Sequence, residues 1–385
     1  MSGNPQKFTG RAFALRLAAF YAALFITLGV QLPFLPVWLA AKGLDASAIG
    51  IVLAVPMVVR VLAIPMATRA ADRRGALRAT IVTAAAAAVA GYGALGFAES
   101  MIAIMAAYAL ASAAYTPLFL LTDAYALRGL AERGRAYGPV RLWGSAAFIA
   151  ASLGAGSLLD VIAARDLIWL IVAAMGLAAA TACALVPLAD GGAHIPGTHP
   201  SAKALLRNPA FLAVAAAASL VQASHALYYG FSTIAWQTEG FDGTTIGALW
   251  ALGVLAEIVL FAVSARLPFA PTALILIGAA GAVIRWSTMA LAPPAAALPV
   301  LQCLHALSFG ATHLGALTFV TRAAPAGLGA TAQGYLGVGL GLVMAGAMGL
   351  SGVLYGRQGG LAYAAMALTA CAGGVFALVA HRLAR

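Results

Sequence analysis

Long apolar runs recur along the whole chain, and they constrain its fold more than any other feature. A helix needs about 20 mainly apolar residues to cross the hydrocarbon core of a bilayer. Only 9% of the residues are charged, against about a quarter in a typical soluble protein. The alternating pattern of a membrane β-barrel does not occur. We therefore predict an all-α membrane protein.

The apolar segments number twelve, in two groups of six. They lie near residues 13–38, 46–69, 77–98, 101–126, 138–159, 167–188, 208–235, 244–266, 270–291, 295–321, 328–355 and 360–382. The longest polar connection separates the two groups. The sequence therefore predicts 12 transmembrane helices in two six-helix bundles, at 1–189 and 208–385, joined by a cytoplasmic linker at 190–207.

The basic residues are distributed unevenly between the loops. If the N-terminus is cytoplasmic, the inner loops and tails hold sixteen lysines and arginines and the outer loops hold three. Positive charge concentrates on the cytoplasmic side of membrane proteins. We therefore predict that both termini are cytoplasmic. The net charge of +11 is explained by this topology, and no nucleic-acid partner is needed.

An internal repeat relates the two groups of segments. Residues 43–50 have the sequence GLDASAIG, and residues 240–247, which lie 197 positions later, have the sequence GFDGTTIG. The same offset aligns Arg60 with Glu257. Repeated halves are typical of secondary transporters, whose substrate site usually lies near the bilayer midplane between the halves.

Five charged residues lie inside apolar segments: Arg60, Asp123, Arg141, Glu257 and Arg285. A charge at the centre of a membrane helix costs about 2.5–3.5 kcal/mol, so it must be paired or face water. Asp123 with Arg141, and Glu257 with Arg285, lie on consecutive segments, and each couple could form a buried ion pair. Both a buried ion pair and a substrate contact fit Asp123 and Arg141. Arg60 is left to bind an anionic substrate group, such as a carboxylate.

Polar residues form stripes on two of the apolar segments. Gln222, His225 and Tyr229 have the spacing of one helix face, as do His305, Ser308 and Thr312. Lipid cannot satisfy such groups, so we expect both stripes to line a cavity. Tyr228, Trp250, Trp286, Phe119 and Phe148 are candidate aromatic walls of that cavity, and His313 is a further candidate on the second striped segment.

Proton coupling requires a group that is neutral in one state and charged in another. Glu257 fits this role because the protonation of a carboxyl group responds both to burial and to a nearby arginine. His305 can belong to the same relay. No cluster of carboxylates suited to sodium is evident, so we expect coupling to protons.

No cofactor or metal site is expected. A Walker motif is absent, which disfavours ATP-driven transport. Cys183, Cys303 and Cys371 lack metal-ligand spacing, and we expect them to be small core residues.

The loop at 68–78 resembles the signature loop of the major facilitator superfamily through Asp72, Arg73 and Gly75, although Thr68 and Ala76 depart from the pattern. The runs at 120–124, 137–148, 223–232, 250–262, 284–286 and 302–305 resemble the bacterial 3-phenylpropionate transporter group of that superfamily. The resemblance implies transport across a bacterial inner membrane.

A more distant resemblance is to lactose permease. The matched intramembrane charged and histidine residues of that permease correspond to Asp123, Arg141, Glu257, Arg285 and His305 of this sequence. Ser308 stands at its proton-carrying glutamate, Gln302 at a lysine, and Phe148 at the tryptophan that stacks on the sugar. The resemblance therefore does not extend to galactoside specificity, and Glu257 is the remaining intramembrane carboxylate of the second half.

We predict a secondary active transporter, not an enzyme, that couples protons to symport of a small aromatic organic acid by alternating access, as a monomer. A nucleoside or sugar symporter and a drug or metabolite exporter are the alternatives. Predicted proton-coupling residues are Glu257, His305, Arg285 and Asp123. Predicted substrate-binding residues are Arg60, Arg141, Gln31, Phe119, Phe148, Gln222, His225, Tyr228, Tyr229, Trp250, Ser308, Thr312 and His313.

Overall fold

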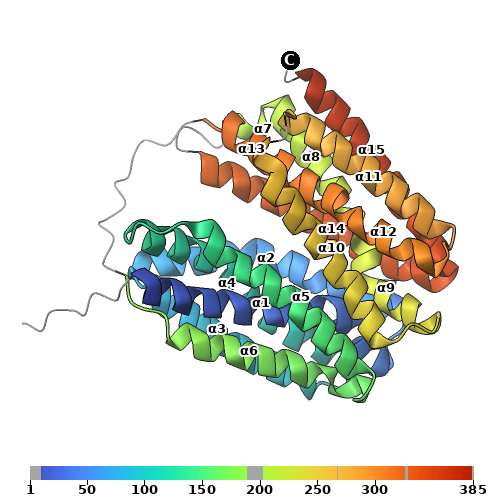
Figure 1. Ribbon diagram of the computed structural model, residues 1–385, viewed down its shortest axis with the longest axis horizontal. Coiled ribbons are helices and arrows are strands. Elements are labelled where there is room, and N and C mark those ends of the chain that lie inside the picture. Colours follow the sequence, from blue (N-terminus) through green and yellow to red (C-terminus); the bar gives the residue numbers. More distant parts are fainter. Residues whose placement is uncertain (1–9, 189–202, 267, 326–327, 384–385) are drawn as a thin grey trace, which may run out of the picture.

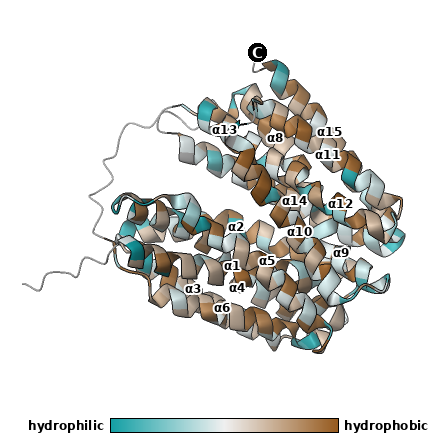
Figure 2. Ribbon diagram, in the orientation of Figure 1, coloured by the Kyte–Doolittle hydropathy of each residue, from teal (hydrophilic) through white to brown (hydrophobic). Residues whose placement is uncertain are grey.

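The fold is helical throughout the part of the chain that the computed structural model describes, residues 10–188, 203–266, 268–325 and 328–383. No strand occurs in these residues. Eleven stretches among them are long and apolar enough to cross a membrane. Apolar residues dominate the helices and hydrophilic residues gather toward their ends (Figure 2). The prediction of an all-α membrane protein is confirmed.

The helices of the first half follow the predicted apolar segments closely. They are α1 (Gly10–Ala41), α2 (Ala46–Arg74), α3 (Leu77–Gly96), α4 (Met101–Ala131), α5 (Tyr137–Leu159) and α6 (Leu167–Cys183). The predicted linker, 190–207, falls outside the described residues as far as position 202, and a short helix α7 (Lys203–Leu206) follows.

The second half contains more elements than the six predicted segments. They are α8 (Pro209–Ala223), α9 (Ala226–Thr238), α10 (Gly243–Val263), α11 (Pro271–Ala290), α12 (Leu298–Cys303), the π-helix η4 (Ala306–Ala311), α13 (Thr312–Ala323), α14 (Gly329–Gln358) and α15 (Tyr363–Leu383). Two segments expected as continuous helices, 208–235 and 295–321, are interrupted, the first between Ala223 and Ala226 and the second by the π-helix.

The internal repeat has the same local structure in both halves. Gly43 and Gly240 both have a positive φ, 87° and 89°, a backbone conformation that favours glycine. Asp45 and Asp242 then cap α2 and α10, each accepting a hydrogen bond from a backbone N–H three residues later. The two motifs therefore start equivalent helices.

Helices α1–α6 pack against one another, and helices α8–α15 do the same (Figure 1). In the first half α1 lies against α5 and α6, and α3 lies against α4 and α6. In the second half α15 lies against α8 and α11. In the described residues the halves meet where α2 lies against α14, α5 against α10, and α9 against both α1 and α2.

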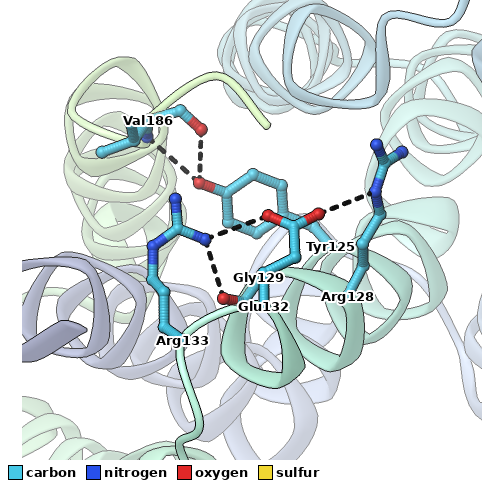
Figure 3. Close-up of polar contacts among 6 residues, drawn as sticks. All are labelled: Tyr125, Arg128, Gly129, Glu132, Arg133 and Val186. Atoms are coloured by element: carbon cyan, nitrogen blue, oxygen red, sulfur yellow. Dashed lines mark hydrogen bonds and ion pairs between the residues drawn. The ribbon is translucent and has the colours of Figure 1, made fainter. Parts of the chain in front are cut away.

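The end of α4 is fixed to the segment that follows α6 (Figure 3). The Tyr125 hydroxyl donates to the carbonyl oxygen of Val186 at 2.6 Å and accepts from its N–H at 3.1 Å. Two turns further on, at the C-cap of α4, Glu132 forms ion pairs with Arg128 and Arg133, both at 3.2 Å. This end of the first half contains the basic loops on which the predicted orientation rests.

Apolar side chains cover much of the outer surface, among them Ile102 and Leu291, which are 81% and 80% exposed. Such a surface suits contact with lipid. The expectation that the three cysteines are core residues is wrong, because Cys183, Cys303 and Cys371 are all exposed. In a membrane protein an apolar segment has a lipid-facing side, so apolar surroundings in the sequence do not imply burial.

Candidate functional site

Glu257 lies in the middle of α10 with 19% of its side chain exposed. Its Oε2 atom is 3.8 Å from Nε2 of His305. The predicted ion pair between Glu257 and Arg285 is wrong, since no such pair occurs among the described residues. The two side chains instead approach His305 from different helices, and His305 separates the carboxylate from the guanidinium.

Arg285 of α11 is completely buried and binds neutral groups. Its Nη1 donates to Nδ1 of His305 at 3.1 Å, and its Nη2 donates to Oε1 of Gln302 at 2.6 Å. The guanidinium carbon lies 4.5 Å from the ring centres of both Tyr228 and Trp286. Within the described residues its Nε has no hydrogen-bond partner. Arg285 is therefore a buried cation without a carboxylate partner.

The bond from Arg285 determines the tautomer of His305. A guanidinium can only donate, so Nδ1 of His305 must accept. The neutral ring then has its proton on Nε2, the atom that faces Glu257. Arg285, His305 and Glu257 thus form a chain across α11, the turn after α12, and α10, with a proton between the histidine and the glutamate.

His225 lies at the break between α8 and α9, next to this chain. Its Nδ1 lies 3.2 Å and 3.1 Å from the carbonyl oxygens of Val221 and Gln222, so this atom has the proton. Its Nε2 therefore accepts from the Ser308 hydroxyl, at 3.0 Å. The ring centres of His225 and His305 are 5.4 Å apart.

The π-helix changes the predicted stripe of His305, Ser308 and Thr312. A π-turn inserts an extra residue, and such turns often occur at functional sites. Here Ser308 contacts His225, and Thr312 donates to the carbonyl oxygen of Ser308 at 2.9 Å. His313 is exposed and stacks on Phe309 at 5.9 Å, and Phe309 in turn stacks on His305 at 5.1 Å. Hydropathy gives no signal for such an insertion.

Aromatic residues enclose the same region. Tyr228 stacks on Trp250 with ring centres 4.5 Å apart, and Tyr229 lies 6.1 Å from Trp250 and 5.6 Å from His225. The Trp250 N–H donates to the hydroxyl of Thr233 at 3.1 Å. Gln222 is buried and donates to the carbonyl oxygen of Phe309 at 3.3 Å. The structure thus brings the predicted residues of α8, α9 and α10 together.

In the first half, the predicted ion pair between Asp123 and Arg141 is also wrong. Oδ1 of Asp123 accepts from the hydroxyls of Tyr21 at 2.5 Å and Tyr137 at 2.8 Å. Arg141 lies over the ring of Phe25, with its guanidinium carbon 4.1 Å from the ring centre, and forms no ion pair in the described residues. The two phenol groups therefore supply the hydrogen bonds of Asp123, and Arg141 is left without an ion pair in the described residues.

The other predicted residues of the first half lie around this arginine or further away. Phe119 packs edge-on against Phe25 at 5.4 Å, and Phe148 is buried at 4% exposure. Gln31 donates to the Tyr108 hydroxyl at 2.9 Å and accepts from the hydroxyl of Tyr92 at 2.7 Å. Gln31 therefore belongs to a separate polar network of α1, α3 and α4.

Arg60 lies against α14 and not in the chain of Arg285. A methyl group on Gly341 would lie 3.6 Å from Cδ of Arg60, and the described residues offer Arg60 no hydrogen bond or ion pair. In the predicted signature loop, Asp72 and Arg73 end α2 as exposed residues. Gly75 follows with a φ of 58° and donates to the carbonyl oxygen of Asp72 at 3.2 Å.

No group of three or more metal-ligating side chains occurs in the described residues. The chemistry available at this site is uptake and release of a proton at Glu257, next to the Nε2–H of His305, and binding of an anion by Arg141 or Arg285.

Comparisons with known proteins agree with this fold. The sequence model of the MFS_1 like family matches residues 14–365. A probable 3-phenylpropionic acid transporter of Escherichia coli (strain K12) is 34% identical over 314 residues, which cover 79% of this chain and 81% of the relative. A maltose permease of Geobacillus stearothermophilus is 30% identical over 332 residues, 84% of this chain and 83% of the permease.

A solved structure of a mutant of the nucleoside transporter NupG has the same fold, with a TM-score of 0.83 at 15% identity. The match covers 97% of this chain and 100% of that structure.

Proposed function

The chain belongs to the MFS_1 like family of membrane transporters, and from that premise we propose that it imports a small aromatic organic acid together with protons. It is a secondary transporter and not an enzyme. We further propose that the protein works by alternating access between its two halves. It does so as a monomer in a bacterial inner membrane. The Escherichia coli relative supports this substrate class and this location.

We propose 12 membrane crossings, with both termini cytoplasmic and the halves at 1–189 and 208–385. The last apolar stretch, Thr331–Leu383, has 53 residues and covers α14 from Thr331 onward and all of α15. As one helix it would be about 80 Å long, against a hydrocarbon core of about 30 Å. The turn at Gly359–Ala362 between the two helices supports two crossings.

The chain of Arg285, His305 and Glu257 is the observation on which proton coupling rests. It places a carboxyl group next to a neutral imidazole in a buried region, with a single proton between them. Glu257 can accept a proton without breaking an ion pair to an arginine. We propose that Glu257 takes up a further proton from the solvent and releases it again during transport, while His305 keeps its Nε2 proton facing the carboxyl group and Arg285 orients the histidine.

A substrate carboxylate fits the positive charge that the protein leaves unpaired. Arg141 has aromatic neighbours but no ion pair, and Arg285 has only neutral partners, in the described residues. We propose that Arg141 binds the substrate carboxylate, because its guanidinium lies over the ring of Phe25 and forms no ion pair in the described residues. In this proposal the substrate anion binds in the first half and the proton binds at Glu257 in the second, and alternation of the two halves with both bound links the two fluxes.

Transport of a nucleoside or a sugar is the second candidate. The maltose permease relative and the likeness in fold to a nucleoside transporter favour it. An uncharged substrate would make no use of the free arginine, so the two candidates differ in their need for a carboxylate.

A thermal-shift screen of the purified protein distinguishes these substrates. A ligand that binds the folded state stabilises it by about 2.7 kcal/mol at one hundred times its Kd. We expect 3-phenylpropionate to raise the Tm, more at the lower of two pH values, and 3-phenylpropionamide to have little effect. Stabilisation by maltose or a nucleoside, without any by the acid, would contradict the proposal.

A further inference from the structure

Helices α5 and α10 approach each other backbone to backbone at the end of the molecule away from the basic loops. A methyl group on Gly156 of α5 would clash with the carbonyl oxygen of Gly243 of α10, and one on Gly243 would clash with that of Gly156. One turn further along, a methyl group on Gly247 would clash with the carbonyl oxygen of Ser152. The two halves therefore meet here without side chains between them.

Asp160 adds a set of hydrogen bonds to this contact. Its Oδ1 accepts from the backbone N–H of Gly243 at 2.6 Å, and its Oδ2 accepts from the N–H of Thr244 at 3.3 Å. The Thr244 hydroxyl also lies 3.4 Å from Oδ2 and 3.0 Å from the hydroxyl of Ser157. One carboxylate of the first half thus caps the first turn of a helix in the second half.

The charge of Asp160 suits its partner helix and not its own. Asp160 is the C-cap of α5, where the helix dipole disfavours an anion. The N-terminus of α10 favours one, and three of its free N–H groups are taken by Asp160 and Asp242. Donation from the Thr245 N–H holds the pKa of Asp242 below its usual range, as expected at such a positive helix end.

The equivalent crossing of α2 with α14 is made by glycines. A methyl group on Gly50 would lie 2.8 Å from the carbonyl oxygen of Met348, and one on Gly352 would clash with that of Ala46. Asp45 caps its own helix there by accepting from the N–H of Ala48 at 2.8 Å. The carboxylate that bridges the halves is therefore a feature of the α5–α10 crossing.

We propose that Asp160 is a latch that holds the α5–α10 end of the transporter closed and opens when the halves separate. In the proposed orientation this is the outer end, so the latch stabilises the state closed to the outside. The inference rests on the proposed alternating access, but not on the substrate or on the proton. Opening this end exchanges the carboxylate's bonds to Gly243 and Thr244 for bonds to water.

Spin labels at Val161, just after α5, and Glu239, just after α9, measure how far the two halves separate near the α5–α10 crossing. Both residues are exposed. The three native cysteines are first replaced by alanine. We expect the short distance to dominate in the protein with Asp160 intact. Asp160→Ala should raise the ratio of long to short distances about tenfold, since hydrogen bonds to a charged group are among the strongest in proteins.

Asp166→Ala is the matched control, because it removes a carboxylate from the same end of the molecule without a helix-capping bond. If Asp160→Ala does not fold, Asp160→Asn is measured in its place. Asparagine keeps the size of the side chain without its charge, and it should shift the distances in the same direction. Distances unchanged in folded Asp160→Ala, or in Asp160→Asn in its place, would overturn the latch. The measurement needs no substrate, so failure of the proposed transport activity would be seen separately.

Discussion

Replacing Glu257 by glutamine is expected to abolish accumulation of the substrate against its gradient while exchange of bound substrate continues. Glutamine has nearly the same shape as the glutamate but cannot exchange a proton. The halves still alternate with substrate bound, so labelled substrate outside should exchange for unlabelled substrate inside. In proteoliposomes with an imposed pH gradient, the ratio of internal to external substrate should fall to its equilibrium value.

Glu239→Gln is the control for this experiment. Glu239 lies in the same half, at the exposed C-cap of α9, and has no contact with the chain of Arg285. It should accumulate substrate as the unmodified protein does. A Glu257→Gln protein that still accumulates substrate against its gradient would show that the proton is bound elsewhere.

Arg285→Lys is expected to reduce the initial rate of transport about 100-fold or more although the positive charge is kept. Lysine presents a point charge and cannot reproduce the planar fork that reaches both His305 and Gln302. A buried acceptor left without its donor costs about 1–3 kcal/mol, and two acceptors are affected here. The free His305 ring can then rotate or change tautomer, and its proton no longer faces Glu257.

Initial rates of uptake measure this effect, with size-exclusion chromatography to confirm that the variant folds. Arg322→Lys at the exposed end of α13 is the matched control and should transport normally. If Arg285→Lys takes up substrate at a rate within a few-fold of that of the unmodified protein, transport does not need Arg285 to orient His305.

The apolar runs were sufficient to predict the helices, because the length of a membrane helix is set by the bilayer. They could not predict the two interruptions in the second half. Residues 224 and 225 and the π-helix lie within apolar sequence, and a change of helical geometry leaves hydropathy unchanged. These two interruptions place His225 against Ser308, a contact that the spacing of a regular helix does not predict.

Both predicted ion pairs were wrong for a related reason. Consecutive segments need not pack against each other: α10 lies against α5, α12 and the π-helix, whereas α11 lies against α15, α13 and the π-helix. Asp123 is bound by two phenols from α1 and α5, and Arg285 by two neutral groups that follow it in the sequence. The carboxylate of Glu257 and the imidazole of His305, predicted to act together, do lie next to each other.

The most direct test of proton coupling is the proton flux that accompanies the substrate. Proteoliposomes containing a pH-sensitive dye, with no initial pH gradient, are given a gradient of 3-phenylpropionate, and vesicles without protein correct for passive entry of the acid. We predict internal acidification in the presence of the unmodified protein, and acidification only at the passive rate in the presence of Glu257→Gln. Uptake of the acid without acidification beyond the passive rate, or acidification by Glu257→Gln equal to that of the unmodified protein, would contradict the proposed role of Glu257.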